Sequence, residues 1–310
     1  MPDNRERTGH LAQVVSVSAF SIGVMVQKGL TVRYPAADVV ALQFACAAVL
    51  MWVVCAGLGF LPRRLAEALP GIFWGCLTPG LVFLFASAGA ARTDGVSVAL
   101  IWGLMPLMGP FLARILLGER FHWSLPAGAG VSFCGLVVLT LDRLAIGSGD
   151  APGNLLVLCG VLSAATGQII GRRLNTAGAP WFRMATLQIT GAAALALLVA
   201  LGDGAWQLPA RDDTAAFVAL AYLVLGMTVL NFIGYNLALS RIQVAWIALY
   251  NSLNPALGSL TAVLLLGELV RPLDVAGIAI IVAGIAVPHA LRIRRARAGL
   301  PRTGRVVPTD

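Results

Sequence analysis

The stretch NSLNPALGSLTAVLLLGE, residues 251–268, is apolar enough in its second half to lie in a membrane. It nevertheless contains two asparagines and a proline near its start, and it ends on a glutamate. A second stretch, IWGLMPLMGPFLARILLGE at residues 101–119, also combines a proline, an apolar run and a final glutamate. Polar groups and prolines inside an apolar run are costly in lipid, which cannot satisfy their hydrogen bonds. Their recurrence at two places indicates one structural element used twice.

The two stretches belong to an internal repeat. When the sequence is shifted by 149 positions, 14 of the 41 residues from 98 to 138 equal their counterparts, and Pro106 matches Pro255. A shift of 145 relates the beginnings of the two halves, where Leu42-Gln43 matches Leu187-Gln188. We therefore predict two copies of one unit, at 11–141 and 153–291, with short tails at 1–10 and 292–310.

Composition places these copies in a membrane. The 310 residues are 58% hydrophobic and 12% charged, with a mean hydropathy of +0.85, which is far less charge than the surface of a soluble protein needs. Apolar runs of about 20 residues recur, whereas a β-barrel would alternate polar and apolar residues. The sequence predicts an all-α polytopic membrane protein without a soluble domain. Breaks at proline, glycine and charged residues predict ten transmembrane helices, at about 11–32, 38–59, 70–91, 95–117, 123–141, 153–173, 180–201, 214–236, 243–266 and 272–291.

The basic residues predict the orientation of these helices. If the N-terminus and every second loop lie on one side, that side holds 16 basic residues and the other side holds six. Basic residues near spans stay in the cytoplasm, so we expect both termini there, in the cytoplasmic (inner) membrane of a bacterium. Five helices per copy is an odd number, so the second copy enters the membrane from the opposite side. The result is a 5+5 inverted-topology repeat, in which one half can rock against the other around a midplane site.

A family resemblance rests on the repeated proline. In the fourth helix of each half the proline stands 13 residues before the glutamate of a terminal Gly-Glu, which resembles the EamA-type transporters of the drug/metabolite transporter superfamily. The resemblance covers essentially the whole chain. It implies ten helices with both termini inside, and transport of small metabolites, often outward, including amino acids and their derivatives. Lys28 near the end of the first helix resembles a common family feature, whereas Gln43 stands where the family often has an arginine.

The prolines and neighbouring amides are the candidate functional residues. Pro106 and Pro255 each remove a backbone donor, and they are predicted hinges lining a cavity or else static kinks. Amides in this region either hold the amine or carboxylate of a substrate against an aromatic wall or bond between helices. Lys28 is either an electrostatic group at the outer mouth or a side chain that snorkels to the interface. The predicted substrate-binding residues are Trp102, Tyr250, Asn251, Asn254, Gln168, Asn231, Ser21 and Lys28.

The charged residues argue against chemistry in the membrane. Glu119 and Glu268 end their helices, and we predict that they are structural anchors that cap the following helix or pair with an arginine. No Asp or Glu lies in the middle of a predicted span, and the three histidines lie near span ends, so the sequence does not support proton coupling. An intramembrane aspartyl protease needs two buried aspartates and a zinc protease needs an HExxH motif, and the sequence has neither. Five cysteines without a CxxC indicate neither a disulfide framework nor a zinc site. We expect no enzyme, no metal and no cofactor.

The expected function is transport by alternating access. The substrate would be a small polar or amphipathic metabolite, such as an amino acid, a derivative or a drug-like compound, and export is the expected direction. An uptake facilitator and a non-transporting membrane subunit, whose repeat is purely architectural, are the alternatives. The expected partners are the substrate and the lipid bilayer, with no nucleic acid, and the protein would act as a monomer or homodimer.

Overall fold

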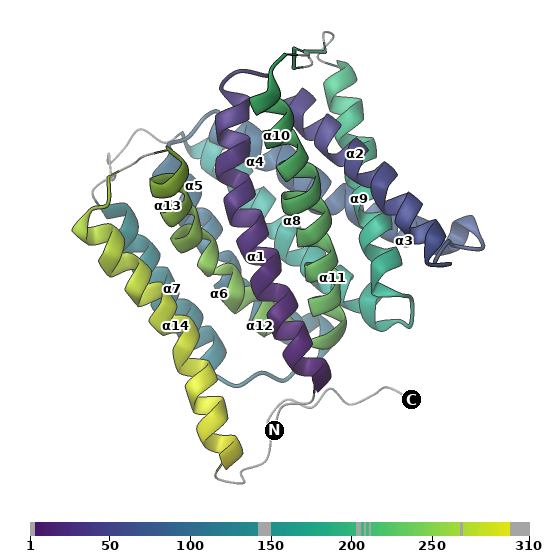
Figure 1. Ribbon diagram of the computed structural model, residues 1–310. Coiled ribbons are helices and arrows are strands. Elements are labelled where there is room, and N and C mark those ends of the chain that lie inside the picture. The colour runs from purple at the N-terminus through teal and green to yellow at the C-terminus, as the bar shows by residue number, and fades with distance from the viewer. Residues whose placement is uncertain are drawn as a thin grey trace.

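The structure is a computed structural model that describes residues 4–141, 150–202, 206–207, 209–210, 212–266 and 269–297. Within these residues every regular element is helical (Figure 1). Two π-helical segments, Cys76–Leu81 and Leu223–Leu230, join α3 to α4 and α10 to α11. The α-helices are α1 (Asn4–Thr31), α2 (Ala36–Gly57), α3 (Leu65–Gly75), α4 (Val82–Ala90), α5 (Gly95–Gly103), α6 (Met105–Leu117), α7 (Ser124–Thr140), α8 (Ala151–Thr176), α9 (Trp181–Gly202), α10 (Thr214–Tyr222), α11 (Asn231–Arg241), α12 (Val244–Asn251), α13 (Leu253–Leu266) and α14 (Pro272–Arg297).

Several of these helices are long enough to cross a membrane. By length and composition, eight segments of the described chain qualify: Asn4–Thr31, Ala36–Gly57, Leu65–Ala90, Gly95–Leu117, Ala151–Thr176, Trp181–Gly202, Thr214–Arg241 and Pro272–Arg294. α7 is apolar but has 17 residues, and a break at Ser252 separates α12 from α13. The all-helical class is therefore confirmed and fits a polytopic membrane protein. The number of ten spans stays a prediction.

The segment formed by α3 and α4 is interrupted in its middle. Thr78 is extended, with φ −141° and ψ 111°, and the Thr78–Pro79 peptide is cis. An extended residue breaks the ladder of helical hydrogen bonds, and a carbonyl released in lipid needs another partner. Gln188 of α9 provides one, because its Nε2 donates to the carbonyl oxygen of Thr78 at 2.9 Å.

The other half contains the counterpart of this contact. Gln43 of α2 occupies the position equivalent to Gln188, and its Nε2 donates to Thr228 Oγ1 at 2.7 Å within the second π-helical segment. Both glutamines are buried. Each half thus donates a glutamine to the interrupted helix of the other half. Where the family resemblance would favour an arginine, this chain has an amide that joins the two halves.

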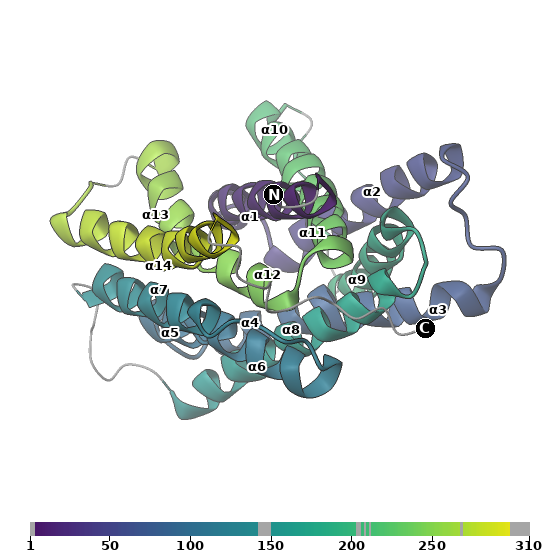
Figure 2. The same ribbon diagram turned by 90° about the horizontal axis from the view of Figure 1, so that it is seen from below.

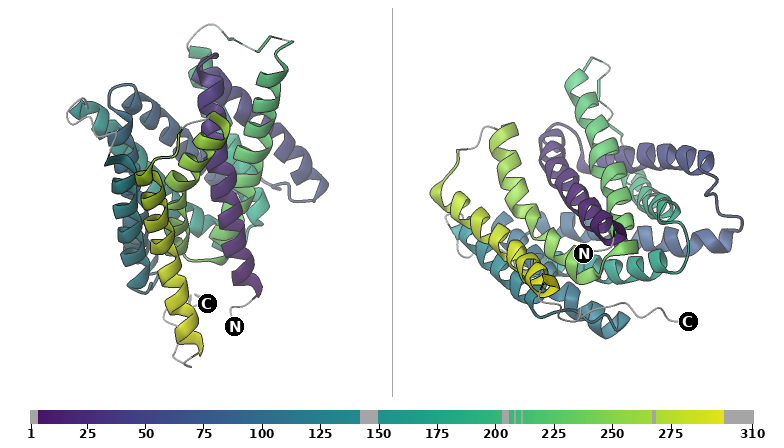
Figure 3. Two further views of the ribbon diagram at one scale, coloured as in Figure 1. Left: turned by 60° about the vertical axis from the view of Figure 1, so that its left-hand side comes forward. Right: turned by 60° about the horizontal axis from the view of Figure 1, so that its bottom comes forward.

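α7 and α14 form the closest symmetric contact between the halves, and they lie side by side (Figures 1 and 2). A Cβ on Gly128 would lie 2.4 Å from the carbonyl oxygen of Gly284, and one on Gly135 would lie 2.8 Å from that of Gly277. The shift of 149 exchanges these pairs, since Gly128 corresponds to Gly277 and Gly135 to Gly284. Between them, Ser132 Oγ donates to the carbonyl oxygen of Ile281, its own counterpart, at 3.2 Å. Because each glycine contact maps onto the other when the two halves are interchanged, an approximate twofold axis passes through the crossing of α7 and α14. Figure 3 shows the pair from two further sides.

The two hinge candidates lie just after breaks in their helices. The chain leaves the α-helix at Leu104 and at Ser252, so Pro106 falls in the first turn of α6 and Pro255 in the first turn of α13. A proline in the first turn has no intrahelical hydrogen bond to lose. Leu104 and Ser252 keep right-handed helical φ and ψ, so each proline lies just after an interruption in the hydrogen bonding of its helix and not midway along an unbroken one. Their role as hinges stays a prediction.

An ion pair fixes the beginning of α10 at the end of the bundle where α1 ends. Asp213 accepts hydrogen bonds from the backbone N–H of Ala216 at 3.1 Å and from the Tyr34 hydroxyl at 2.6 Å, and it pairs with Arg33 at 2.6 Å. The Tyr34 hydrogen bond, followed by that of Ala216, lowers the pKa of Asp213 below its ordinary value of 3.8. The same hydrogen bond raises the pKa of Tyr34 above 10.0.

The glycine crossing predicts one effect on stability. Replacing Gly128 by Val places side-chain atoms against the Gly284 carbonyl, and overpacking of this kind destabilises a fold by about 2 kcal/mol or more. Thermal unfolding of the purified protein, followed by tryptophan fluorescence, should shift to lower temperature. Gly130→Val is the matched control, because nothing lies within 4 Å of a Cβ built on Gly130 of the same helix. Equal melting temperatures for the two variants would contradict the close packing of this crossing.

The cap at Asp213 predicts a pH dependence. Because the folded-state pKa of Asp213 is lowered, its contacts stabilise the fold above its ordinary pKa and lose this effect as the pH falls through the folded-state value. Asp213→Asn should therefore melt below the wild type at about pH 6, and the difference should shrink towards about pH 3. Asp212→Asn, at an exposed neighbouring position, is the control. A difference between wild type and Asp213→Asn that is independent of pH would contradict this role for Asp213.

Candidate functional site

Three polar side chains of α1 are bonded to three asparagines on α11, α12 and α13, and we call these contacts the amide row. The hydrogen bonds run from Gln13 Nε2 to Asn251 Oδ1 (3.1 Å), from Ser16 Oγ to Asn231 Oδ1 (2.7 Å) and from Ser21 Oγ to Asn254 Oδ1 (2.8 Å). In each bond the asparagine oxygen accepts, so the amide nitrogen keeps both of its hydrogens for another partner. The asparagine side chains are partly buried. The row can therefore present N–H donors to a polar molecule inside the bundle.

The sequence identified part of this arrangement. The structure brings together four predicted residues, Asn231, Asn251, Asn254 and Ser21, although they come from four different helices. Gln13 and Ser16 were missed as donors. Both lie inside the first apolar run, three positions apart and so on the same helix face, which is a signal that the sequence did contain.

Gln168 is a second polar group inside the bundle. It lies on α8, is 1% exposed, and its Oε1 accepts no hydrogen bond from the described residues. A Cβ built on Gly109 of α6 would lie 3.5 Å from this oxygen and 2.8 Å from the Cβ of Ala248 on α12. Gln168 thus faces the place where α6 and α12 meet. A buried amide oxygen can accept a hydrogen bond from a donor that reaches it.

Trp102 and Lys28 lie outside these hydrogen bonds. Trp102 is partly buried on α5, a helix that packs on α7 where Gly103 faces Phe133 and Leu136. Lys28 is exposed in the last turn of α1. The structure does not bond either side chain to the amide row, and both remain predictions as substrate contacts.

Tyr250 lies beside the amide row, at the end of the bundle where α1 begins and α14 ends. It is 6% exposed, and its hydroxyl oxygen lies 3.1 Å from His10 Nδ1 and 2.8 Å from His289 Nε2. Arg292 approaches the other side of the His10 ring, with 3.1 Å between Nη1 and Nε2. The hydroxyl expected to face a substrate is therefore engaged with two histidines. The sequence placed both histidines at span ends, but it could not pair residues separated by 279 positions.

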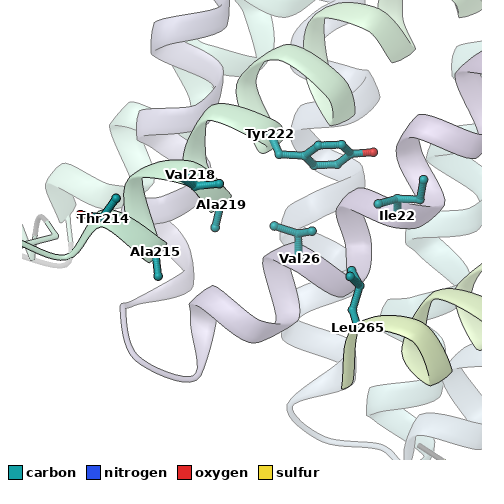
Figure 4. Close-up of a pocket in the computed structure, with 8 residues that line it drawn as sticks. All are labelled: Ile22, Val26, Thr214, Ala215, Val218, Ala219, Tyr222 and Leu265. Carbon is teal, nitrogen blue, oxygen red and sulfur yellow. The ribbon is translucent and has the colours of Figure 1, made fainter. Parts of the chain in front are cut away.

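The opposite end of the bundle is hollowed. A groove of about 520 Å³ opens between α1, α10 and the end of α13, as Figure 4 shows. Its walls are apolar apart from Thr214 and Tyr222, and the Tyr222 hydroxyl donates to the carbonyl oxygen of Ala19 at 3.2 Å. The lining residues are Ile22, Val26, Thr214, Ala215, Val218, Ala219, Tyr222 and Leu265. Ser21 adjoins Ile22 on α1, so the groove begins next to the amide row.

Glu119 makes an ion pair and caps a helix. Its Oε1 accepts from Arg172 Nε at 2.9 Å, and its Oε2 accepts from the backbone N–H of Val244, the first residue of α12, at 3.0 Å. Gly118, in the left-handed conformation with φ 67°, ends α6 just before it. Glu119 thus caps α12 of the other half and does not cap the helix that follows it in sequence. Glu268, its predicted counterpart, lies outside the described residues.

A metal site is not evident in the described part of the chain, where no three His, Cys, Asp or Glu residues gather closely enough to hold an ion. The polar groups of the amide row are amides and hydroxyls. Such groups recognise polar molecules by hydrogen bonds.

Comparison with known proteins gives the family. The EamA-like transporter family matches residues 7–141 and 151–287. The chain is 24% identical to the uncharacterized transporter YyaM of Bacillus subtilis (strain 168) over 204 residues, which is 64% of this chain and 65% of that protein, just under two thirds of its length. It is 26% identical to a protein named "Probable terminal-alkyne amino-acid exporter" from Streptantibioticus cattleyicolor over 236 residues, 69% of this chain and 75% of the other.

A solved crystal structure shares the fold. It covers 93% of this chain and 99% of its own, with a TM-score of 0.78 and 21% sequence identity. The family and the apolar helices together indicate a multi-pass membrane protein. Because the family matches both halves and nearly the whole length, the chain belongs to the EamA-like transporter family.

Proposed function

We propose that this protein exports a small amphipathic amino acid or a derivative by alternating access. The observation that carries the proposal is the amide row, which lies inside the bundle between the Tyr250 contacts at one end and the apolar groove at the other. An amphipathic amino acid needs hydrogen-bonding groups for its charged part and apolar walls for its side chain. The relative named as a terminal-alkyne amino-acid exporter supports a substrate of this kind.

The architecture of the proposal is a 5+5 inverted repeat of ten spans in a bacterial cytoplasmic membrane. α7 and the pair α12–α13 would supply the fifth and ninth spans, and both termini would lie in the cytoplasm, as the basic residues predict. The exchanged glycine contacts of α7 and α14 and the crossed glutamine bonds support this symmetry. In such a repeat the halves rock about the shared axis and expose the central site to each side in turn.

The roles of the site residues follow from their remaining hydrogen-bond capacity. The N–H donors of Asn231, Asn251 and Asn254 would bind a carboxylate, whose oxygens only accept. Gln168 Oε1, a buried acceptor, would receive a hydrogen bond from an ammonium group. Ser21 holds Asn254 in place. Trp102 and Tyr250 would provide aromatic surface, and Lys28 would attract anionic groups at the outer mouth.

Transport in proteoliposomes tests the site. With radiolabelled L-leucine as the probe, Asn254→Leu should raise the apparent KM about tenfold or more, because a hydrogen bond to a charged group contributes about 1.5–3 kcal/mol. Asn4→Leu, the same change at an exposed position, should leave transport unchanged. An unchanged KM in Asn254→Leu would make Asn254 a packing residue. If neither leucine nor any other amino acid moves, a non-transporting role is favoured.

Direction is tested in cells. Overexpression of an exporter should raise the resistance of a bacterial host to a toxic amino-acid analogue, because the analogue is removed from the cytoplasm. Increased sensitivity would instead identify an uptake facilitator. Cells expressing Asn254→Leu at equal membrane abundance control for effects of overexpression alone.

A further inference from the structure

α5 and α12 are counterparts in the repeat, but the structure buries only one of them. The shift of 149 places α5 on α12 and matches Ala99-Leu100 with Ala248-Leu249. Seven of the eight residues of α12 are buried, whereas none of the nine residues of α5 is. Two copies of one element therefore have different surroundings, and the difference comes from the helices that pack against them.

A close contact with α6 covers α12. A Cβ built on Gly109 of α6 would lie 2.8 Å from the Cβ of Ala248, which is 0% exposed. One turn further along each helix, Ala113 and Val244 belong to the same buried cluster. Small residues let helix backbones approach one another in this way within a bilayer. The contact joins α6 of the first half to α12 of the second half.

The same contact is not made by the counterpart helices. Gly258 of α13 corresponds to Gly109, and Ala99 of α5 corresponds to Ala248, so the counterpart pair consists of the same two residue types. A Cβ built on Gly258 has no atom of the described residues, Ala99 included, within 4 Å. α5 packs instead on α7 and α8, and α13 packs on α1 and α14. The repeat therefore contains one closed glycine–alanine pair and one open pair.

The two pairs lie on opposite sides of the amide row. Ala248 precedes Asn251 by three positions on α12, and Gly258 follows Asn254 by four positions on α13. Each pair is thus about one helical turn from an asparagine of the row. α12 meets the beginning of α1, and α13 ends in the wall of the groove. The closed pair therefore lies between the row and the end where α1 begins, and the open pair lies between the row and the groove.

The closed pair is supported by a cap that the open pair does not have in common with it. Glu119, at the end of α6, accepts from the first N–H of α12 and pairs with Arg172. The beginning of α5 is capped within its own half, because Asp94 accepts from the N–H groups of Val96 and Ser97 at 3.0 and 2.9 Å. The first half thus holds α12 at both the cap and the glycine contact, whereas nothing in the described part of α13 holds α5.

We propose that Ala99 and Gly258 form a second gate of the transporter and meet only when the Gly109–Ala248 contact opens. This gate rests on the proposed function, since it exposes the same site to each side in turn. In an inverted repeat, each half takes in one state the packing that the other half has in the opposite state. With both termini in the cytoplasm, the structure is open to the outside, and closure of Ala99 on Gly258 opens the amide row to the cytoplasm.

Disulfide cross-linking tests the gate without a substrate. In full-length protein that lacks its five native cysteines and is held in lipid nanodiscs, Ala99→Cys/Gly258→Cys should form a disulfide slowly under oxidation, because a disulfide needs Cβ atoms within about 4.5 Å. Val98→Cys/Gly258→Cys, with the neighbouring residue on a different face of α5, is the matched control and should stay reduced. Failure of the Ala99→Cys/Gly258→Cys disulfide, or equal formation in the control, overturns the proposal.

The two contacts should also exclude one another. Gly109→Cys/Ala248→Cys should form its disulfide quickly, because this pair is already closed. When all four substitutions are combined, two thiols per molecule should remain free after oxidation, because one closed pair keeps the other open. Loss of all four thiols would overturn the exchange.

A bulky residue at the open glycine gives a second test that does not depend on the four substitutions folding together. The thiol of Ala248→Cys should react with a water-soluble maleimide only when its contact opens. Gly258→Trp should slow this reaction about tenfold or more, because the side chain fills the space that the gate needs to close. Gly130→Trp, at another glycine with open space around its Cβ, should leave the rate unchanged. Equal rates in the two variants would overturn the proposal.

The flux assay separates this gate from the proposed function. Disulfides that exclude one another in a protein that carries no amino acid leave the gate standing and reject the proposed function. Oxidised Ala99→Cys/Gly258→Cys should stop carrying L-leucine and recover with a reductant. Transport of L-leucine that continues in the cross-linked protein rejects the gate alone.

Discussion

The need to satisfy every polar group without water governs this structure. In a bilayer a backbone carbonyl or a side-chain amide must find its partner within the protein, so each departure from a regular helix requires a specific contact. The extended Thr78 is accommodated because Gln188 donates to its backbone carbonyl, and Gln43 donates to the Thr228 hydroxyl in the π-helical segment of the other half. Removing such a partner would leave a buried group unsatisfied at a cost of about 1–3 kcal/mol. The irregular helical segments therefore depend on contacts from the opposite half.

Close packing of helices at glycines also holds the two halves together. Lipid gives helices no hydrophobic reason to associate, so their contact depends on small residues that let backbones approach. At the crossing of α7 and α14, the backbone carbonyls lie where any side chain on the four glycines would collide. The crossing relates the halves by an approximate twofold axis while Ser132 and Ile281 meet at its centre. Because the α7–α14 crossing lies on this axis, it can stay packed while the two halves tilt about it, as the proposed rocking motion requires.

The all-helical membrane class could be predicted from the sequence, because apolar length is a local signal and the shift of 149 is a periodic one. The elements that escaped prediction depend on partners. Pro106 and Pro255 indicate the interruptions at Leu104 and Ser252 only approximately, and no proline marks the π-helical segment at Leu223–Leu230. Glu119 pairs with an arginine, as expected, but the helix that it caps is α12, 125 positions away, and the next helix in sequence is not capped by it. The amide row was found in part because asparagines stand out in an apolar run. The His10–Tyr250–His289 contact was not, because it joins the two ends of the chain.

The repeat also shows where symmetry ends. Positions that pack against the axis, such as Gly128 and Gly277, or that bond the halves, such as Gln43 and Gln188, have the same residue in both copies. Positions that face the interior differ: Asn251 corresponds to Trp102, Asn254 to Met105, Tyr250 to Ile101 and His289 to Thr140. A symmetric frame is needed for two equivalent tilted states, whereas an amino acid, with unlike ends, is held best by unlike walls. At these four pairs of positions the first copy is mostly apolar and the second is polar, an asymmetry that suits the proposed substrate.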